Sequence, residues 1–157
     1  MMKPNSINTD SDDLFSLSRF TTAQEGIYDS ALVELRSGLK RTHWMWFIFP
    51  QIDGLGHSYI AKQYAIKSIL EAEQYLKHPI LGPRLVECSE TVLALKGRSI
   101  SEIFGYPDDL KLKSSMTLFE CVAGSPPVFA EILDKYFHGE RDTKTLSLLG
   151  MVRRNKV

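Results

Sequence analysis

The sequence between Arg41 and Gln51 reads RTHWMWFIFPQ and places both tryptophans of the chain, with two of its eight phenylalanines, in eleven residues. Its apolar centre, residues 44–49, ends at Pro50, and this length suits a short strand or an irregular buried segment better than a long helix. Its borders carry the polar side chains of Arg41, His43 and Gln51, which are uncommon in a segment that only fills the core. We call residues 41–51 the aromatic segment and expect it to form the wall of a pocket.

Helical spacing of apolar residues dominates on both sides of the aromatic segment. It predicts one broken helix or two short ones over residues 14–37, and further helices over 58–76, 84–96, 99–104, 107–122, 128–136 and 142–149. Capping boxes begin at Thr22 and Ser68, and the second allows a break near Lys67. Ser99 is the expected start of the short helix that ends before Gly105. The expected fold class is mostly α, as a single compact domain of about seven helices with at most one or two short strands.

The length of 157 residues is enough for one domain with a sizeable core. We expect a loose tail over residues 1–12, a globular domain over 13–150 and a short basic tail over 151–157. Lys plus Arg and Asp plus Glu both total 19, so the formal net charge is zero and nothing supports nucleic-acid binding. No window approaches the ~18 uninterrupted apolar residues of a membrane span, and the polar N-terminus lacks the apolar core of an export signal. The expected location is the cytoplasm.

Several kinds of chemistry have no support in the sequence. The four histidines are scattered, without the spacing that puts two ligands on one helical face, so we expect no metal site and no cofactor. Cys88 and Cys121 lie in helical patterns, which indicates two reduced, buried thiols. Nucleophilic catalysis lacks a local motif. Acid/base hydrolysis by a carboxylate with a lysine or histidine helper stays open, because it needs no diagnostic motif.

The aromatic segment is the first candidate for a binding site. Its tryptophans follow Lys40, Arg41 and His43, so a stacking surface could lie beside an anion-binding group. Any single aromatic side chain is nevertheless more often a core residue than a ligand contact. The turn at residues 54–56, Gly-Leu-Gly, could offer backbone amides to an anion, although a tight turn is its more common role.

The stretch from Asp108 to Ser115 is the second candidate, because it gathers two carboxylates, two ammonium groups and two hydroxyls at a helix start. A capped surface helix would look much the same, and the simplest role for Asp108 is a plain N-cap. Lys111 and Ser115 lie on one helical face, however, and if that face meets the aromatic segment they supply a donor and a hydroxyl to one cleft. Asp142 is a fainter candidate, with helix capping as its simpler role.

The candidate residues divide into two roles. The acid/base candidates are His43, Asp108 and Asp109. The candidate ligand contacts are Arg41 and Lys111 for anions, Trp44 or Trp46 for stacking on a ring, and Gln51 and Ser115 for positioning the ligand.

Long motifs in the chain resemble one known family. They run through residues 40–51 and 54–56, His78-Pro79, residues 103–105, Asp108-Asp109 and residues 114–119. The family is the bacterial domain of unknown function 1810, some members of which carry the label "calpastatin". The resemblance implies a small, mainly helical bacterial protein and provides no catalytic residue to transfer.

A much looser similarity points to the NADAR proteins, which are N-glycoside hydrolases acting on ADP-ribose-type molecules. The shared features are an early aromatic-rich segment, a Glu-Ala helix, and a helix bearing lysine and methionine that precedes an apolar one. Together with the residues above, this similarity leads to the hypothesis of a pocket for a phosphorylated or ribosylated, nucleotide-like small molecule, with N-glycoside hydrolysis as the candidate reaction. The alternative is a non-catalytic protein-interaction or stress-response module whose aromatic segment is structural core. The sequence leaves the oligomeric state open.

Overall fold

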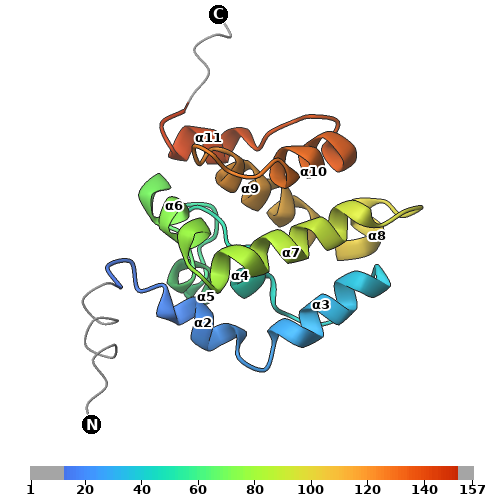
Figure 1. The fold of residues 1–157 in the computed structure, drawn as a ribbon. Helices are drawn as coiled ribbons and strands as arrows, with labels where there is room; N and C mark the ends of the chain where they lie inside the picture. Colours follow the sequence, from blue (N-terminus) through green and yellow to red (C-terminus); the bar gives the residue numbers. More distant parts are fainter. Residues whose placement is uncertain (1–12, 152–157) are drawn as a thin grey trace, which may run out of the picture.

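The structure is a computed structural model that describes residues 13–151 (Figure 1). The described chain contains ten helices, six of them at least seven residues long. They are α2 (Ser18–Gln24), α3 (Tyr28–Ser37), α4 (Met45–Ile48), α5 (Tyr59–Gln63), α6 (Ile69–Lys77), α7 (Leu81–Ala94), α8 (Ile100–Phe104), α9 (Asp108–Glu120), α10 (Val128–Phe137) and α11 (Thr143–Leu148). Within these residues there is no strand, only one parallel bridge between Ile52 and Ile66. The predicted mostly α fold is confirmed.

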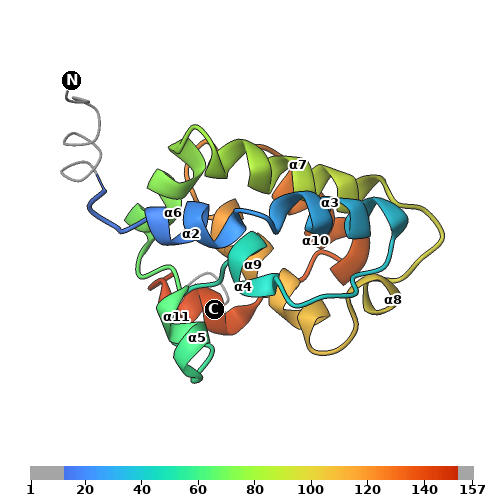
Figure 2. The same ribbon diagram turned by 90° about the horizontal axis from the view of Figure 1, so that it is seen from below.

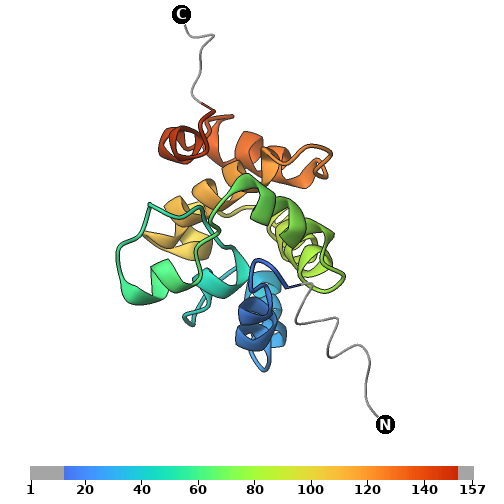
Figure 3. The same cartoon turned by 90° about the vertical axis from the view of Figure 1, so that its left-hand side faces the viewer.

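Two long helices organise the packing. α7 crosses the middle of the domain and packs against α3, α4, α6 and α10, while α9 packs against α6, α8, α10 and α11. Figure 1 shows α9, α10 and α11 on one side of α7, with α2 and α3 on the other. Figures 2 and 3 show the same arrangement from below and from the left-hand side. The short helix α4 lies inside this core, with Met45 and Ile48 buried, whereas α5 has no buried residue and lies at its edge.

Several predicted helix ends are confirmed by their caps. Gly38 closes α3 with a φ of 79°, in the left-handed region that glycine adopts without strain. Ser99 starts α8 as predicted and forms a capping box with Glu102, and the Ser58 hydroxyl accepts a hydrogen bond from the Ala61 amide at 3.1 Å. The possible break near residue 67 is real, because α5 ends at Gln63 and α6 begins after the Ser68 cap.

Three predictions about local structure were wrong. The capping box at Thr22 does not start a helix, since Thr22 lies inside α2. α7 begins at Leu81 rather than Arg84, because Pro83 falls in the first turn, where no amide donor is needed. The aromatic segment was expected to be a short strand or an irregular buried segment, and residues 45–48 instead form the short helix α4, with Met45 and Ile48 buried as expected.

The buried centre of the aromatic segment is part of the core. Trp44 is 1% exposed, and its ring lies 6.2 Å from the ring of Phe49 and 6.3 Å from that of Phe104, measured between centroids. Such tilted and edge-to-face pairs are favourable geometries for aromatic rings. The segment therefore joins α4 to α8 through tilted and edge-to-face aromatic contacts.

An ion pair between Arg19 and Glu71 holds the start of the domain, with side chains 16% and 1% exposed. The Arg19 guanidinium uses all five of its N–H groups, donating to the carbonyls of residues 15, 16, 63 and 65 and to the Glu71 carboxylate. The Glu71 carboxylate also accepts from the Lys67 amide at 2.8 Å. Because every polar atom has a partner, this pair joins α2 to the start of α6 without leaving an unsatisfied charge.

The predicted tails are outside this description. Residues 1–12 and 152–157 lie beyond the described part of the chain. Within residues 13–151, none of the helices is long and apolar enough to cross a membrane.

Candidate functional site

Glu34 holds the first part of the aromatic segment in place. Its carboxylate, on α3 and 8% exposed, accepts hydrogen bonds from the amides of Arg41 and Thr42, from the Thr42 hydroxyl and from the Trp44 indole N–H, at 2.7 to 3.1 Å. Burial would raise the pKa of Glu34, but these hydrogen bonds lower it from 4.5 to about 2. The loop from residue 41 to 44 is therefore wrapped around one buried anion.

Lys40 connects this loop to the start of α9. Its ammonium lies 2.8 Å from an Asp108 carboxylate oxygen, donates to the Thr42 carbonyl at 2.6 Å and stands 4.9 Å from the Trp44 ring centroid. Its backbone amide donates to the carbonyl of Ile103 in α8. The side chain is only 5% exposed, so Lys40 is a structural cross-link between two segments far apart in the sequence.

Lys111 makes a second, more open connection. Its ammonium lies 3.5 Å from the other carboxylate oxygen of Asp108 and 5.1 Å from the centroid of the Trp46 ring. The Lys111 side chain is 29% exposed. α9 therefore does meet the aromatic segment, and each tryptophan of that segment has a lysine ammonium over its ring.

Asp108 is not the plain N-cap that its position suggests. Pro107 occupies the cap position of α9 with no side-chain hydrogen bond, and Asp108 is the first helical residue. Its two oxygens are divided between Lys40 and Lys111. Together, Lys40, Asp108 and Lys111 carry a net charge of +1. Asp108 lies at the amino-terminal end of α9, where the helix dipole favours a carboxylate.

Three other predicted residues lie at the exposed borders. Arg41 and His43 are exposed, and Gln51 is half-buried. The guanidinium of Arg41 and the imidazole of His43 make no hydrogen bond or ion pair with any residue from 13 to 151. The Gln51 backbone carbonyl accepts from the Ile66 amide at 2.8 Å and so belongs to the bridge beside α5.

Two predicted residues are enclosed. Asp109 is buried, and its carboxylate accepts from the Ser101 hydroxyl and the Leu110 amide, both at 2.8 Å. Ser115 is completely buried and its hydroxyl has no hydrogen-bond partner in the described chain. Asp109 therefore joins α8 to α9, and Ser115 lies inside the domain rather than on its surface.

The weaker sequence motifs have structural roles. Gly54 has a φ of 107°, and a Cβ there would lie 3.1 Å from the Leu148 side chain, while one at Gly56 would lie 2.6 Å from the Ala61 Cβ. These close contacts indicate that residues 54–56 serve as a tight turn rather than as an anion-binding site. Asp142 caps α11 by accepting from the Thr145 amide, and it also accepts from the Ser114 hydroxyl of α9 at 3.1 Å.

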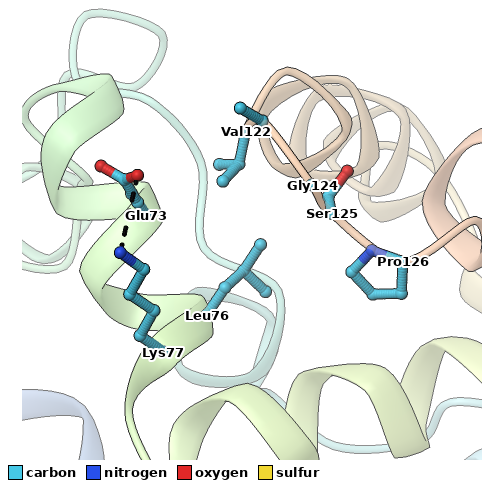
Figure 4. Close-up of a pocket in the computed structure, with 8 residues that line it drawn as sticks. Glu73, Leu76, Lys77, Val122, Gly124, Ser125 and Pro126 are labelled. Carbon is cyan, nitrogen blue, oxygen red and sulfur yellow. Dashed lines mark ion pairs between the residues drawn. The ribbon is translucent and has the colours of Figure 1, made fainter.

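Two hollows identified on the surface lie away from the aromatic segment. One, of about 310 Å³, is lined by Leu14, Phe15, Ser16, Arg19, Lys67 and Glu71. The other, of about 200 Å³, lies between α6 and the loop after α9 (Figure 4). The cluster of Lys40, Asp108 and Lys111 is therefore a surface arrangement and not one of these two concavities.

Residues 13–151 contain no assembled site for metal binding or for thiol chemistry. That part of the chain contains no group of three or more histidine, cysteine or acidic side chains placed to hold a metal ion. Cys88 is buried, and burial raises its pKa to about 12, while Cys121 is only half-buried. The prediction of two buried thiols is therefore correct for Cys88 alone.

The family assignment follows from comparison with known proteins. A family model described as "Protein of unknown function (DUF1810)" matches residues 14–149. The chain belongs to the DUF1810 family. The DUF1810 match includes Glu34, Lys40, the aromatic segment and the whole of α9.

One solved structure is close to this DUF1810 chain. It is the conserved hypothetical protein Rv1873 from Mycobacterium tuberculosis, with 53% identity and a TM-score of 0.85 over 87% of this chain and 97% of that chain. A search of curated proteins found no match. The comparisons establish the DUF1810 fold and assign it no activity.

Glu34 is the residue of this region that the sequence did not reveal. It lies on the same helical face as the buried Ala31 and Leu35, which is the one signal that could have identified it. A carboxylate on such a face needs several donors, and the following loop supplies them.

Proposed function

We propose that this DUF1810 protein binds a phosphorylated or ribosylated small molecule on the surface formed by Arg41, Trp46 and Lys111. The observation that carries the proposal is the position of the Lys111 ammonium, 5.1 Å from the centroid of the Trp46 ring and 3.5 Å from an Asp108 carboxylate oxygen. A nucleotide-like ligand needs an aromatic surface for its ring and cations for its phosphate. Trp46 is half-buried and lies near the Lys111 ammonium, and the exposed Arg41 guanidinium comes from the same aromatic segment.

The two lysines have different parts in this proposal. Lys40 is enclosed by Asp108, the Thr42 carbonyl and the Trp44 ring, so it positions the loop and does not contact the ligand. Lys111 is more exposed and its contact with Asp108 is longer, at 3.5 Å. A ligand phosphate can therefore replace Asp108 as the partner of Lys111 more easily than as the partner of Lys40, because a contact of 3.5 Å is weaker than one of 2.8 Å.

The candidate reaction is hydrolysis of an N-glycosidic bond, which rests on the loose similarity to the NADAR proteins. Asp108 would accept a proton from the attacking water, and His43 would donate one to the departing base. In the free protein both oxygens of Asp108 contact lysines. Phosphate binding to Lys111 would release one oxygen for the water, so ligand binding and activation of the base would be coupled.

Thermal-shift measurements test the binding proposal. ADP-ribose, nucleoside phosphates and sugar phosphates should each be screened, and a ligand that binds only the folded protein raises the midpoint of unfolding as its concentration increases above its Kd. The shift should disappear in Arg41→Ala and Lys111→Ala and persist in Lys144→Ala, which removes an exposed cation of α11. The proposal fails if none of these ligands raises the midpoint, or if the shift survives both substitutions.

A second candidate function is a protein-interaction module. It is favoured by the exposure of Tyr106, at 81%, and of Leu110 beside Asp108, together with the burial of Trp44 in the core. In that case ligand screens give no shift, and Tyr106→Ser with Leu110→Ser removes a partner captured from a cell extract. The same double substitution leaves the ligand shift intact if the first proposal is right.

A further inference from the structure

A small cleft separates the end of α6 from the loop that follows α9 (Figure 4). Its volume is about 200 Å³. The lining residues are Glu73, Leu76, Lys77, Val122, Ala123, Gly124, Ser125 and Pro126. None of them belongs to the surface proposed above, so the cleft has to be considered as a separate site.

Both walls of the cleft are fixed before any ligand is present. In the loop, the Ser125 amide donates to the Val122 carbonyl at 3.1 Å and the Ser125 hydroxyl donates to the Glu120 carbonyl at 3.3 Å. Two prolines follow, which restrict the backbone further. The opposite wall is the helix α6, so a ligand would enter a preformed space and order little of the chain.

The interior of the cleft is apolar. Figure 4 shows the side chain of Leu76 directed from α6 into the gap toward Val122 and Pro126. Gly124 leaves the loop side open, because a Cβ at that position would have no atom within 4 Å. The space is thus suited to a branched hydrocarbon group of a small molecule.

Two opposite charges stand at the rim of this apolar space. The Glu73 carboxylate and the Lys77 ammonium come from adjacent turns of α6 and lie 3.8 Å apart, with 35% and 67% of their side chains exposed. An exposed pair at this separation adds little to stability, so a ligand that offers both charges can replace it. A ligand with one charge would leave one of the two groups without its partner.

We propose that this cleft binds a free α-amino acid with a branched apolar side chain. The ligand's ammonium contacts Glu73, its carboxylate contacts Lys77, and its side chain packs against Leu76, Val122 and Pro126. The volume of about 200 Å³ is below the roughly 300 Å³ at which drug-sized ligand sites begin, which limits the occupant to a molecule of this size.

A titration with L-leucine followed by amide NMR shifts tests the proposal on the full chain. Saturable shifts should cluster at residues 73–77 and 122–126. N-acetyl-L-leucine, which lacks the ammonium, and L-leucinamide, which lacks the carboxylate, should each bind about tenfold more weakly, as expected for one lost charge-assisted contact. Glu73→Gln should weaken L-leucine binding to the same extent, whereas Glu131→Gln, an equivalent change on the exposed side of α10, should not alter it.

Three results would overturn this assignment. They are equal binding of L-leucine and N-acetyl-L-leucine, unchanged affinity in Glu73→Gln, and absence of saturable shifts in residues 73–77 and 122–126. Shifts confined to residues 41–46 and 108–111 would place the ligand at the other surface and also reject the cleft. The two proposals can therefore fail separately.

Discussion

Replacing Glu34 by glutamine should destabilise the protein by about 3 kcal/mol at neutral pH. The pKa of Glu34 falls from 4.5 to about 2 on folding, and each pKa unit corresponds to roughly 1.4 kcal/mol of differential stability. Glutamine keeps one oxygen acceptor but replaces the other with an NH2 group, which is itself a donor. It therefore cannot accept all the hydrogen bonds that the N–H and O–H groups of the loop donate to the carboxylate. Urea unfolding at pH 7 measures the difference.

The same prediction has a defined pH dependence. Because the pKa of Glu34 is lower in the folded state, its contribution is complete above about pH 4.5 and is lost as the pH falls toward 2. The stability gap between the natural protein and Glu34→Gln should therefore narrow over that range. Glu90→Gln, an exposed change on α7, should cost less than about 0.5 kcal/mol and serves as the control. A gap below about 1 kcal/mol at pH 7, or one that stays constant down to pH 3, would refute the role given to the carboxylate.

Three further perturbations test other parts of the structure. The Nδ1 atom of His78 accepts hydrogen bonds from two amides at the start of α7, and burial lowers the pKa of His78. The free energy of unfolding should therefore fall as the pH drops below about 6.5. His78→Ala should remove this pH dependence in thermal unfolding. Asp142→Ala should cost about 1–2 kcal/mol in urea unfolding and speed amide exchange in α11, because it removes the helix cap and the bond to Ser114; unchanged exchange would contradict this role. Lys40→Met should cost about 1–3 kcal/mol and Lys111→Met less than about 1 kcal/mol, and equal losses would contradict the division between a buried, close pair and a half-buried, longer one.

Local signals in the sequence predicted the helical framework well. Ser58, Ser99 and Asp142 each accept from the backbone at the expected helix start, since these caps depend only on residues a few positions apart. The capping box at Thr22 failed because the same residue types also occur inside a helix. The early start of α7 was missed because the His78 imidazole, an uncommon cap, accepts the first amides.

The contacts of the candidate site were less predictable. The sequence grouped Lys111 with Asp108 and suggested that α9 meets the aromatic segment, and the structure shows contacts of Lys111 with Asp108 and Trp46. The sequence could not reveal that Lys40 forms an ion pair with one of the two Asp108 carboxylate oxygens, because the two residues are far apart in the chain. Nor could it separate Trp44, which is buried against Glu34, from Trp46, which is not, since both stand in the same apolar run.

The attachment of α11 has a consequence for how the domain opens. The segment leading into this helix is held to α9 through hydroxyl and carboxylate groups, with Thr117 accepting from the Asp142 amide and Ser114 donating to its side chain. Leu148 of α11 is already partly exposed. Releasing the helix would therefore uncover little apolar surface, and such an opening depends only weakly on denaturant concentration. The carboxyl-terminal helix should behave as a separate, low-energy unit of local unfolding while the core around α7 and α9 stays closed.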